Sequence, residues 1–314
     1  MYEHIDEQLA QIANISPGYD CCWAEKEGIV KALQDKIGEY FDINVNDTNE
    51  LEEIKARGYT KLLPLLNEGE INDIVSFLQD KLVYSSHIPP SDGKLRTVEQ
   101  SRHLNAAACY TLPDLLACPH ILEKVLDKGI INLVENYLGA VPTLYSLNTY
   151  WTFKEHGRQE GVKLFHRDID DIKFCCLLIY LVDVDEQTGP FNYISYTHNE
   201  DICVEHIQDE TFCSEIFPPK LISGHGNDTL FESKLSNNIN VLTGVKGTTV
   251  LADTFGLHKG KGQLSKDRLM LWVRYGMHNN GSCQAQTPHP YEIDRQIELD
   301  SRLQYITRRL IKHV

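Results

Sequence analysis

The sequence lacks an apolar stretch long enough to cross a membrane, and it lacks the pattern of a secretory leader. Its longest apolar run covers nine residues, 174–182, whereas a spanning helix needs roughly 20. The first ten residues, MYEHIDEQLA, contain neither a basic segment nor an apolar segment, so we expect no signal peptide. We therefore expect a cytoplasmic protein without a membrane span.

Basic residues are too few to balance the acidic ones. The 314 residues include 30 Lys and Arg against 45 Asp and Glu, which gives a formal charge of -15. Proteins that bind nucleic acids need basic residues to neutralise phosphates, so we expect no nucleic-acid partner. A bound anion would need a local positive site within this negative field.

Paired cysteine motifs are also missing. The chain has nine cysteines, an odd number, and no C-x-x-C. Cys21 is followed by Cys22, and Cys175 by Cys176. Neighbouring residues on a strand point to opposite faces, so we expect neither pair to form a disulfide that cross-links the fold. We expect reduced cysteines that act as small hydrophobic side chains, and the spacing does not suggest a zinc site.

What the chain does contain is a largely helical first half followed by short strands. Apolar spacing and capping residues predict helices at residues 47–57, 69–84 and 119–138. Clusters of Tyr, Thr, Val, Ile and Phe predict strands at residues 143–153, 173–182, 191–196, 248–253 and 269–276. Short strands without intervening helices favour an antiparallel barrel or a double-sheet jelly roll, so the predicted class is α+β.

We expect one structural domain with three parts. Residues 1–140 form a helical layer on the barrel, residues 141–285 form the barrel, and residues 286–314 form a C-terminal helix. Within the barrel, the polar stretch 199–240 is longer than a usual strand connection. Insertions of that length are often lids or substrate-binding elements.

Two histidines and one aspartate carry the strongest chemical signal. His166 and Asp168 are two residues apart, so extended backbone turns both side chains to one side. A later predicted strand leads into His258. Two histidines and one carboxylate on a face form the facial triad of non-haem Fe(II) oxygenases. The sequence predicts that His166, Asp168 and His258 bind iron and are the catalytic residues.

Such a triad leaves three neighbouring coordination positions open, two for a 2-oxo acid and one for dioxygen. Arg268, ten residues after His258, is suited to hold the distal carboxylate of 2-oxoglutarate through paired charge-assisted hydrogen bonds. Arg274 shares its strand face and is the rival anchor. The charges of Fe(II), Asp168, 2-oxoglutarate and Arg268 cancel, so a dry site could hold the whole assembly.

Four tracts of the chain together resemble the phytanoyl-CoA dioxygenase family of Fe(II)/2-oxoglutarate oxygenases, especially its bacterial members. The tracts are residues 58–82, 137–142, 165–198 and 253–268. The resemblance implies a double-stranded β-helix core, with His166, Asp168 and His258 as iron ligands and Arg268 as the 2-oxoglutarate anchor. It also implies hydroxylation, or another C–H oxidation, of a small organic substrate with release of succinate and carbon dioxide.

Other candidates and other functions stay open. Asn148 and Tyr150 share one face of a predicted strand and could contact the cosubstrate, although satisfied core positions suit them equally. Asp253 could orient His258 or cap its loop. The alternative functions are a cupin-like metal-binding protein without catalysis or 2-oxoglutarate, and a protein or peptide hydroxylase. The triad with its arginine disfavours the first, and the predicted lid disfavours the second. Substrate identity and oligomeric state have no sequence signal.

Overall fold

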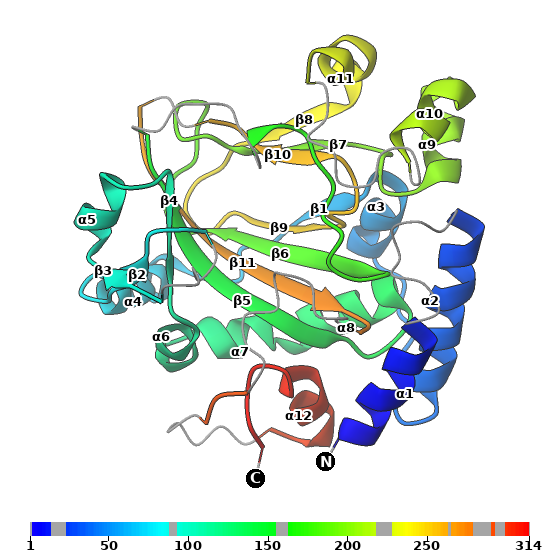
Figure 1. Ribbon diagram of the computed structural model, residues 1–314, viewed down its shortest axis with the longest axis horizontal. Coiled ribbons are helices and arrows are strands. Elements are labelled where there is room, and N and C mark those ends of the chain that lie inside the picture. The colour runs from blue at the N-terminus through cyan, green and yellow to red at the C-terminus, as the bar shows by residue number, and fades with distance from the viewer. Residues whose placement is uncertain are drawn as a thin grey trace.

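Two antiparallel sheets face each other in the computed structural model, with helices covering the outside of the larger sheet (Figure 1). The structure describes residues 2–13, 23–87, 93–154, 163–217, 228–262, 265–278, 290–292 and 299–313. The strands within these residues are β1 Tyr59–Leu62, β2 Val83–Tyr84, β3 Leu95–Arg96, β4 Ala107–Tyr110, β5 Thr143–Thr152, β6 Phe174–Tyr180, β7 Phe191–Ile194, β8 Ile239–Leu242, β9 Thr249–Ala252, β10 His258–Gly260 and β11 Arg268–Gly276. The larger sheet has the order β1-β9-β6-β11-β5-β4-β2-β3, and the smaller has the order β10-β7-β8.

The helices pack mainly around the outside of this sandwich. They are α1 Glu3–Ala13, α2 Trp23–Gly38, α3 Asn49–Arg57, α4 Glu68–Leu78, α5 Val98–Arg102, α6 Leu112–Ala117, α7 Ile121–Val125, α8 Lys128–Leu138, α9 Glu200–Ile207, α10 Glu210–Ile216, α11 Asp228–Leu235 and α12 Ser301–Thr307. Figure 1 shows α7, α8 and α12 beneath the larger sheet and α9 to α11 beside the smaller one. The predicted α+β double-stranded β-helix is confirmed.

Capping residues set the helix ends that the sequence predicted. Thr48 accepts a hydrogen bond from the backbone N–H of Leu51 at 3.2 Å and begins α3. Gly58 ends that helix with a φ of 85°, a left-handed conformation that a side chain would oppose. The α4 helix begins with a capping box between Asn67 and Glu70.

Two predicted helices are shorter than their apolar patterns suggested. Residues 119–138 form α7 and α8 rather than one helix, because Asp127 leaves the helical conformation and accepts hydrogen bonds from Gly129 and Ile130. Residues 69–84 are helical only as far as Leu78. Val83 and its neighbour instead pair with β4, where sheet hydrogen bonds outweigh the helical pattern.

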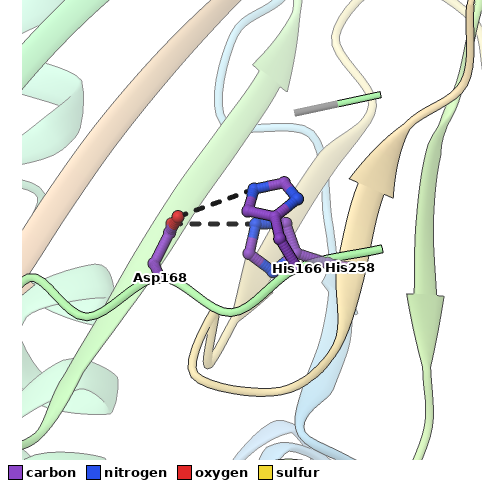
Figure 2. Close-up of side chains that lie close together, drawn as sticks. All are labelled: His166, Asp168 and His258. Atoms are coloured by element: carbon purple, nitrogen blue, oxygen red, sulfur yellow. Dashed lines mark ion pairs between the residues drawn. The ribbon is translucent and has the colours of Figure 1, made fainter. Parts of the chain in front are cut away.

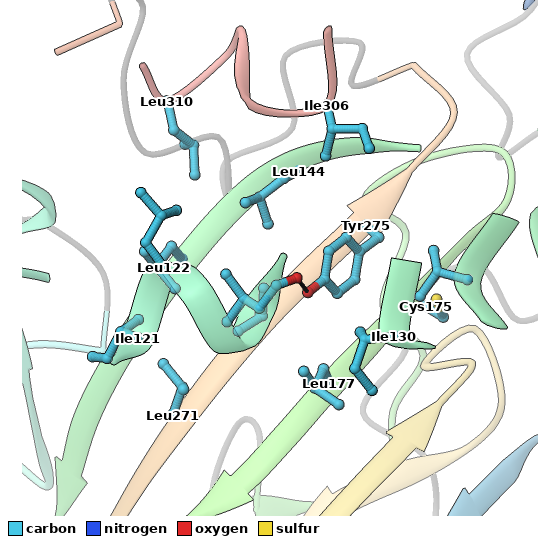
Figure 3. Close-up of a cluster of buried hydrophobic side chains, with 14 of the residues drawn as sticks. Ile121, Leu122, Ile130, Leu144, Cys175, Leu177, Leu271, Tyr275, Ile306 and Leu310 are labelled. Carbon is cyan, nitrogen blue, oxygen red and sulfur yellow. Dashed lines mark hydrogen bonds between the residues drawn. The ribbon is translucent and has the colours of Figure 1, made fainter. Parts of the chain in front are cut away.

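The larger sheet has two buried faces of different character. Its outer face packs against α7, α8 and α12, and Figure 3 shows Leu144, Cys175, Leu177, Leu271 and Tyr275 meeting side chains of these helices. The hydroxyl of Tyr275 donates a hydrogen bond to a carbonyl oxygen of α7, at 2.6 Å. The inner face turns toward the smaller sheet and forms a second apolar cluster. Two arginines described below, Arg268 and Arg274, lie on this inner face, and His258 lies opposite them on β10 of the smaller sheet.

The insertion and the C-terminus differ from their predicted forms. The stretch 199–240 contains α9, α10, α11 and the beginning of β8, so the described part of the expected lid is mainly helical. The described C-terminal residues are helical only at 301–307, because Tyr291 forms a parallel bridge with Ile311 beside that helix. The division of the chain at residues 140 and 285 stays a prediction. Among the described residues, none of the helices has the length and apolarity needed to cross a membrane.

Candidate metal centre

His166, Asp168 and His258 converge between the two sheets (Figure 2). His166 and His258 face each other in an antiparallel bridge, in which each backbone N–H donates to the other residue's carbonyl, at 2.9 and 3.0 Å. Asp168 lies 3.8 Å from Nε2 of His166 and 3.7 Å from Nε2 of His258. All three potential ligand atoms lie within 4.8 Å of one another. The structure thus brings together the three residues that the sequence singled out.

The backbone fixes the proton positions on both histidine rings. Nδ1 of His166 lies 2.8 Å from the carbonyl oxygen of Leu164, and Nδ1 of His258 lies 2.9 Å from that of Gly256. A carbonyl only accepts hydrogen bonds, so each Nδ1 must carry the proton. Each Nε2 is then a lone-pair donor directed at the same point beside Asp168. This tautomer, held from the opposite ring nitrogen, is the one that a metal-binding histidine uses.

Burial and neighbouring charges set the protonation states of the cluster to those that bind a cation. The side chain of His258 is 3% exposed, and its burial, together with His166, lowers its pKa to about 4. The ring is therefore neutral at neutral pH. Burial opposes ionisation of Asp168, but His258 and His166 in their protonated forms, the charge of Arg274 and a hydrogen bond from the side chain of Thr254 lower the pKa of this carboxyl. Oδ2 of Asp168 is buried without a hydrogen-bond donor, so the ionised carboxylate has an unmet demand for positive charge.

The turn from Asp253 to His258 positions the distal ligand. The carboxylate of Asp253 accepts hydrogen bonds from the hydroxyl of Tyr137 and from the backbone N–H of Phe255, the latter at 2.9 Å. Between them, the carbonyl of Thr254 accepts the backbone N–H of Asp168 at 2.9 Å. Of the two roles considered for Asp253, the hydrogen bonds fit the cap of this turn, because His258 uses Gly256 instead.

Arg268 and Arg274 differ in their partners, although both lie on the inner face of β11. Arg268 is 4% exposed and donates from Nη1 to the carbonyl oxygen of Gly189, while its Nε has no partner. No carboxylate among the described residues forms an ion pair with it. Arg274 already has one, since its Nε lies 2.9 Å from Oδ2 of Asp170. Of these two arginines, Arg268 is consequently the one that is free to bind the carboxylate of a ligand.

Asn148 and Tyr150 lie on the inner face of β5, opposite the same stretch of β11. Asn148 pairs with Trp272, and its amide donates to the carbonyl of His87 at 2.9 Å while its own oxygen is buried without a partner. The ring of Tyr150 lies 6.5 Å from that of Trp272. Burial raises the pKa of Tyr150, against the influence of Arg268, so its hydroxyl stays protonated. Their role as cosubstrate contacts stays a prediction.

Sequence reasoning missed two neighbours of the triad. Arg167 lies between two of the predicted ligands and is 3% exposed, yet its guanidinium bonds only backbone carbonyls among the described residues. Asp170 pairs with Arg274, and burial raises its pKa to about 7. For Arg167 a signal was available. Successive side chains on extended backbone point to opposite faces, so Arg167 must point away from the face that holds His166 and Asp168. Nothing in the local sequence shows the pairing of Asp170.

Trp272 and Phe191 complete the surroundings of the distal ligand. The ring of Phe191 lies 5.5 Å from that of His258, and the ring of Trp272 lies 6.4 Å from it. The two aromatic rings approach each other at 5.9 Å with an edge-to-face angle of 79°. Together with Tyr150, whose ring lies near that of Trp272, they place aromatic surface beside the triad. Charges in such surroundings interact more strongly than in water.

Comparison with known proteins gives a likeness of fold. No family model and no curated protein sequence matches the chain. Among solved structures, HygX from Streptomyces hygroscopicus with nickel and 2-oxoglutarate bound is 14% identical, with a TM-score of 0.49, over 84% of this chain and 96% of that one. The epimerase SnoN in complex with Fe3+, alpha ketoglutarate and nogalamycin RO is 13% identical, with a TM-score of 0.48, over 72% and 81%. EctD from S. alaskensis with 2-oxoglutarate and 5-hydroxyectoine is 14% identical, with a TM-score of 0.47, over 74% and 79%.

At identities this low, the chemistry of the present site rests on its own side chains. Membership of the phytanoyl-CoA dioxygenase family likewise stays a prediction, since no family model matches.

Proposed function

We propose that this protein is an Fe(II)- and 2-oxoglutarate-dependent dioxygenase that oxidises a C–H bond of a small organic substrate, with release of succinate and carbon dioxide. The observation that carries the proposal is the set of three ligand atoms within 4.8 Å of one another. Two are unprotonated imidazole nitrogens, and the third belongs to a carboxylate whose buried Oδ2 has no hydrogen-bond donor. A divalent cation satisfies all three at once, and this donor set is the one that non-haem Fe(II) oxygenases use.

The chain's own residues divide the work around such a cation. His166, Asp168 and His258 hold it from one side, and the opposite side faces the space beneath Trp272 and Tyr150. Bound Fe(II) would supply dioxygen activation coupled to the oxidative decarboxylation of 2-oxoglutarate. We assign Arg268 to the distal carboxylate of 2-oxoglutarate, because its planar guanidinium can offer two parallel N–H donors.

The inner face of the barrel limits what reaches the site. Trp272 is 6% exposed and lies between Arg268 and Arg274 on β11, so it separates the two cations. We infer that the cosubstrate occupies the Arg268 side and that the substrate approaches from the side of Arg274 and Asp170. The apolar rings around the triad reduce its contact with water. Restricting water protects a reactive centre from side reactions.

An anaerobic titration of metal-free protein tests the proposal. Fe(II) is added first and 2-oxoglutarate second, and visible absorption is recorded after each addition. We expect a metal-to-ligand charge-transfer band that requires both additions. His166→Ala should lose the band because iron no longer binds. Arg268→Met should bind iron and show the band only at much higher 2-oxoglutarate concentration.

Two outcomes would contradict this function. Iron binding without any band, at saturating 2-oxoglutarate, would support the alternative of a cupin-like metalloprotein that does not use this cosubstrate. Absence of iron binding in correctly folded wild-type protein would remove the metal site altogether. Circular dichroism of each variant separates loss of a ligand from loss of the fold.

A further inference from the structure

A cavity of about 410 Å³ lies on the other side of the turn that carries His258. Its walls come from α2, α3, α8, the beginning of β6 and the N-terminal end of α9, and Figure 1 shows α2, α3 and α9 on one side of the barrel. None of the three predicted metal ligands lines it. The cavity is therefore separate from the candidate metal centre, and its size suits a small organic molecule.

More lysines than carboxylates line this cavity, although Lys31 is paired with Asp35 and Lys55 with Glu52. Four lysines line it, Lys26, Lys31, Lys55 and Lys173, against two carboxylates, Glu27 and Asp253. The chain as a whole has a formal charge of -15. A cluster of cations within a negative surface is the local positive site that an anionic ligand requires.

Lys173 is the cation with the clearest demand for a partner. Among the described residues it forms no ion pair and no hydrogen bond, and its ammonium group lies 5.0 Å from the centre of the Tyr137 ring. Burial lowers its pKa, which means that its present surroundings do not fully stabilise the charge. The negative charge of Asp253 partly offsets this effect, but its carboxylate forms no ion pair with Lys173 among the described residues and accepts hydrogen bonds from Tyr137 and Phe255.

The rest of the wall is apolar. It includes Val30, Ile172, Phe174, Ile202 and Phe255. A bare inorganic anion would leave this surface facing water, whereas a ligand with an apolar body would cover it. Charge and apolar surface together describe a ligand with one anionic end.

We propose that this cavity is an effector site for a small organic anion, a carboxylate or phosphate ester with an apolar body, whose charged end pairs with Lys173. The effector role rests on the turn from Asp253 to His258, which lies beside the cavity. Asp253 and Phe255 line the cavity, while the residue between them, Thr254, accepts the backbone N–H of Asp168 on the opposite side. A ligand that contacts Asp253 or Phe255 therefore acts on the same turn that positions His258 and Asp168.

Isothermal titration calorimetry of the metal-free, full-length protein with benzoate tests the binding. Benzyl alcohol, of nearly the same shape but neutral, is the control ligand. We expect benzoate to bind, and benzyl alcohol to bind at least about 10-fold more weakly, because a neutral hydroxyl can accept a hydrogen bond from the ammonium group but cannot form an ion pair with it. Lys173→Met should weaken benzoate by about the same factor. Lys36→Met is the control variant. Lys36 lies on α2, as Lys26 and Lys31 do, but it is paired with Glu39 and does not line the cavity, so benzoate affinity should be unchanged.

A second arm measures the coupling to the metal centre. Co(II) affinity is determined with and without saturating benzoate, in wild type and in Lys173→Met, and we expect a shift only in wild type. His166→Ala should still bind benzoate, so a failure of the proposed iron function and a failure of this cavity give different results. If Lys173→Met does not fold, Lys55→Met replaces it.

Equal benzoate affinity in wild type and Lys173→Met would overturn the proposal, as would equal binding of benzyl alcohol. Phenyl phosphate in the same assay distinguishes the two kinds of anion, and tighter binding of either one supports the site. An unchanged Co(II) affinity at saturating benzoate would overturn the effector role.

Discussion

The guanidinium of Arg167 donates to the carbonyl oxygen of Ile216, from Nε at 3.2 Å and from Nη2 at 3.0 Å. Its Nη1 also donates to the carbonyls of Thr197, at 2.5 Å, and of Phe255. Arg167 stands between His166 and Asp168 in the sequence, and Ile216 ends α10. One buried side chain therefore connects the segment 166–168, which holds two of the candidate ligands, to the α9–α10 insertion and to the turn before His258.

We predict that Arg167→Met weakens both the fold and the metal site. The substitution leaves several buried carbonyl oxygens without a donor, which should lower the free energy of unfolding by about 3 kcal/mol. It also removes the hydrogen bond to the carbonyl of Phe255, next to Thr254, which helps to hold the turn before His258. Co(II) affinity should therefore fall by roughly 10-fold or more, as it does when residues that orient metal ligands are replaced. Urea unfolding and Co(II) titration measure the two effects. Wild-type Co(II) affinity in a folded Arg167→Met protein would contradict the positioning role.

The two arginines of β11 should have separable effects on cosubstrate binding. Arg268→Met should weaken 2-oxoglutarate by roughly 100-fold, because it removes a paired, charge-assisted interaction. Arg274→Met combined with Asp170→Asn removes the ion pair without leaving a buried charge. This double variant should keep 2-oxoglutarate affinity within about 3-fold of wild type, well below the tenfold change that 1.4 kcal/mol represents. The charge-transfer band, titrated anaerobically, reports both affinities. The reverse order of effects would make Arg274 the anchor.

The sequence was most informative where one local rule decided the structure. His166 and Asp168 lie on one face because extended backbone alternates, and β11 covers Arg268–Gly276 where the apolar pattern predicted a strand at 269–276. The α8 helix ends at Leu138, where the sequence predicted a helix end, and Gly139 caps it with a φ of 73°. Each of these features depends on neighbours in the chain, so a single sequence contains the necessary signal.

Features that depend on distant partners could not be found in the same way. Val83 has a helical neighbourhood but pairs with Tyr110 in the sheet, a contact between residues 27 positions apart. The ion pair of Asp170 with Arg274 joins two segments that no pattern links. The cavity lined by Lys173 is another example, since Lys173 and Lys55 line it together only because α3 packs against the barrel.

The outer face of the larger sheet permits a sharp test of packing energetics. Tyr275 is fully buried and donates a hydrogen bond to the carbonyl of Val125 at 2.6 Å. Tyr275→Phe keeps the ring and should lower the free energy of unfolding by about 1 kcal/mol. Leu271→Ala, on the same face, should lower it by about 3 kcal/mol, because it leaves a cavity in a closely packed layer. Urea unfolding of both variants checks the order, and an equal loss would contradict this account of the layer.

His278 makes acid stability a further test of the structure. The residue is 4% exposed, and burial, together with Arg309 and Arg308, lowers its pKa to about 4, although Asp6 acts in the opposite direction. In an unfolded chain the pKa of histidine is about 6.5. The unfolded state therefore binds more protons than the folded state between pH 6.5 and pH 4. Stability from this residue is present above pH 6.5 and is lost as the pH falls toward 4.

We predict that His278→Gln makes unfolding less dependent on pH in that window. A single proton contributes at most about 1.4 kcal/mol per pH unit, and the difference in slope between wild type and variant should approach this value. Urea unfolding of metal-free protein at intervals from pH 7 to pH 4.5 measures both slopes. His103→Gln is the matched control, because the His103 side chain is 64% exposed. Parallel slopes for wild type and His278→Gln would show that His278 accepts a proton without opening the fold, contrary to its burial between Arg308, Arg309 and Asp171.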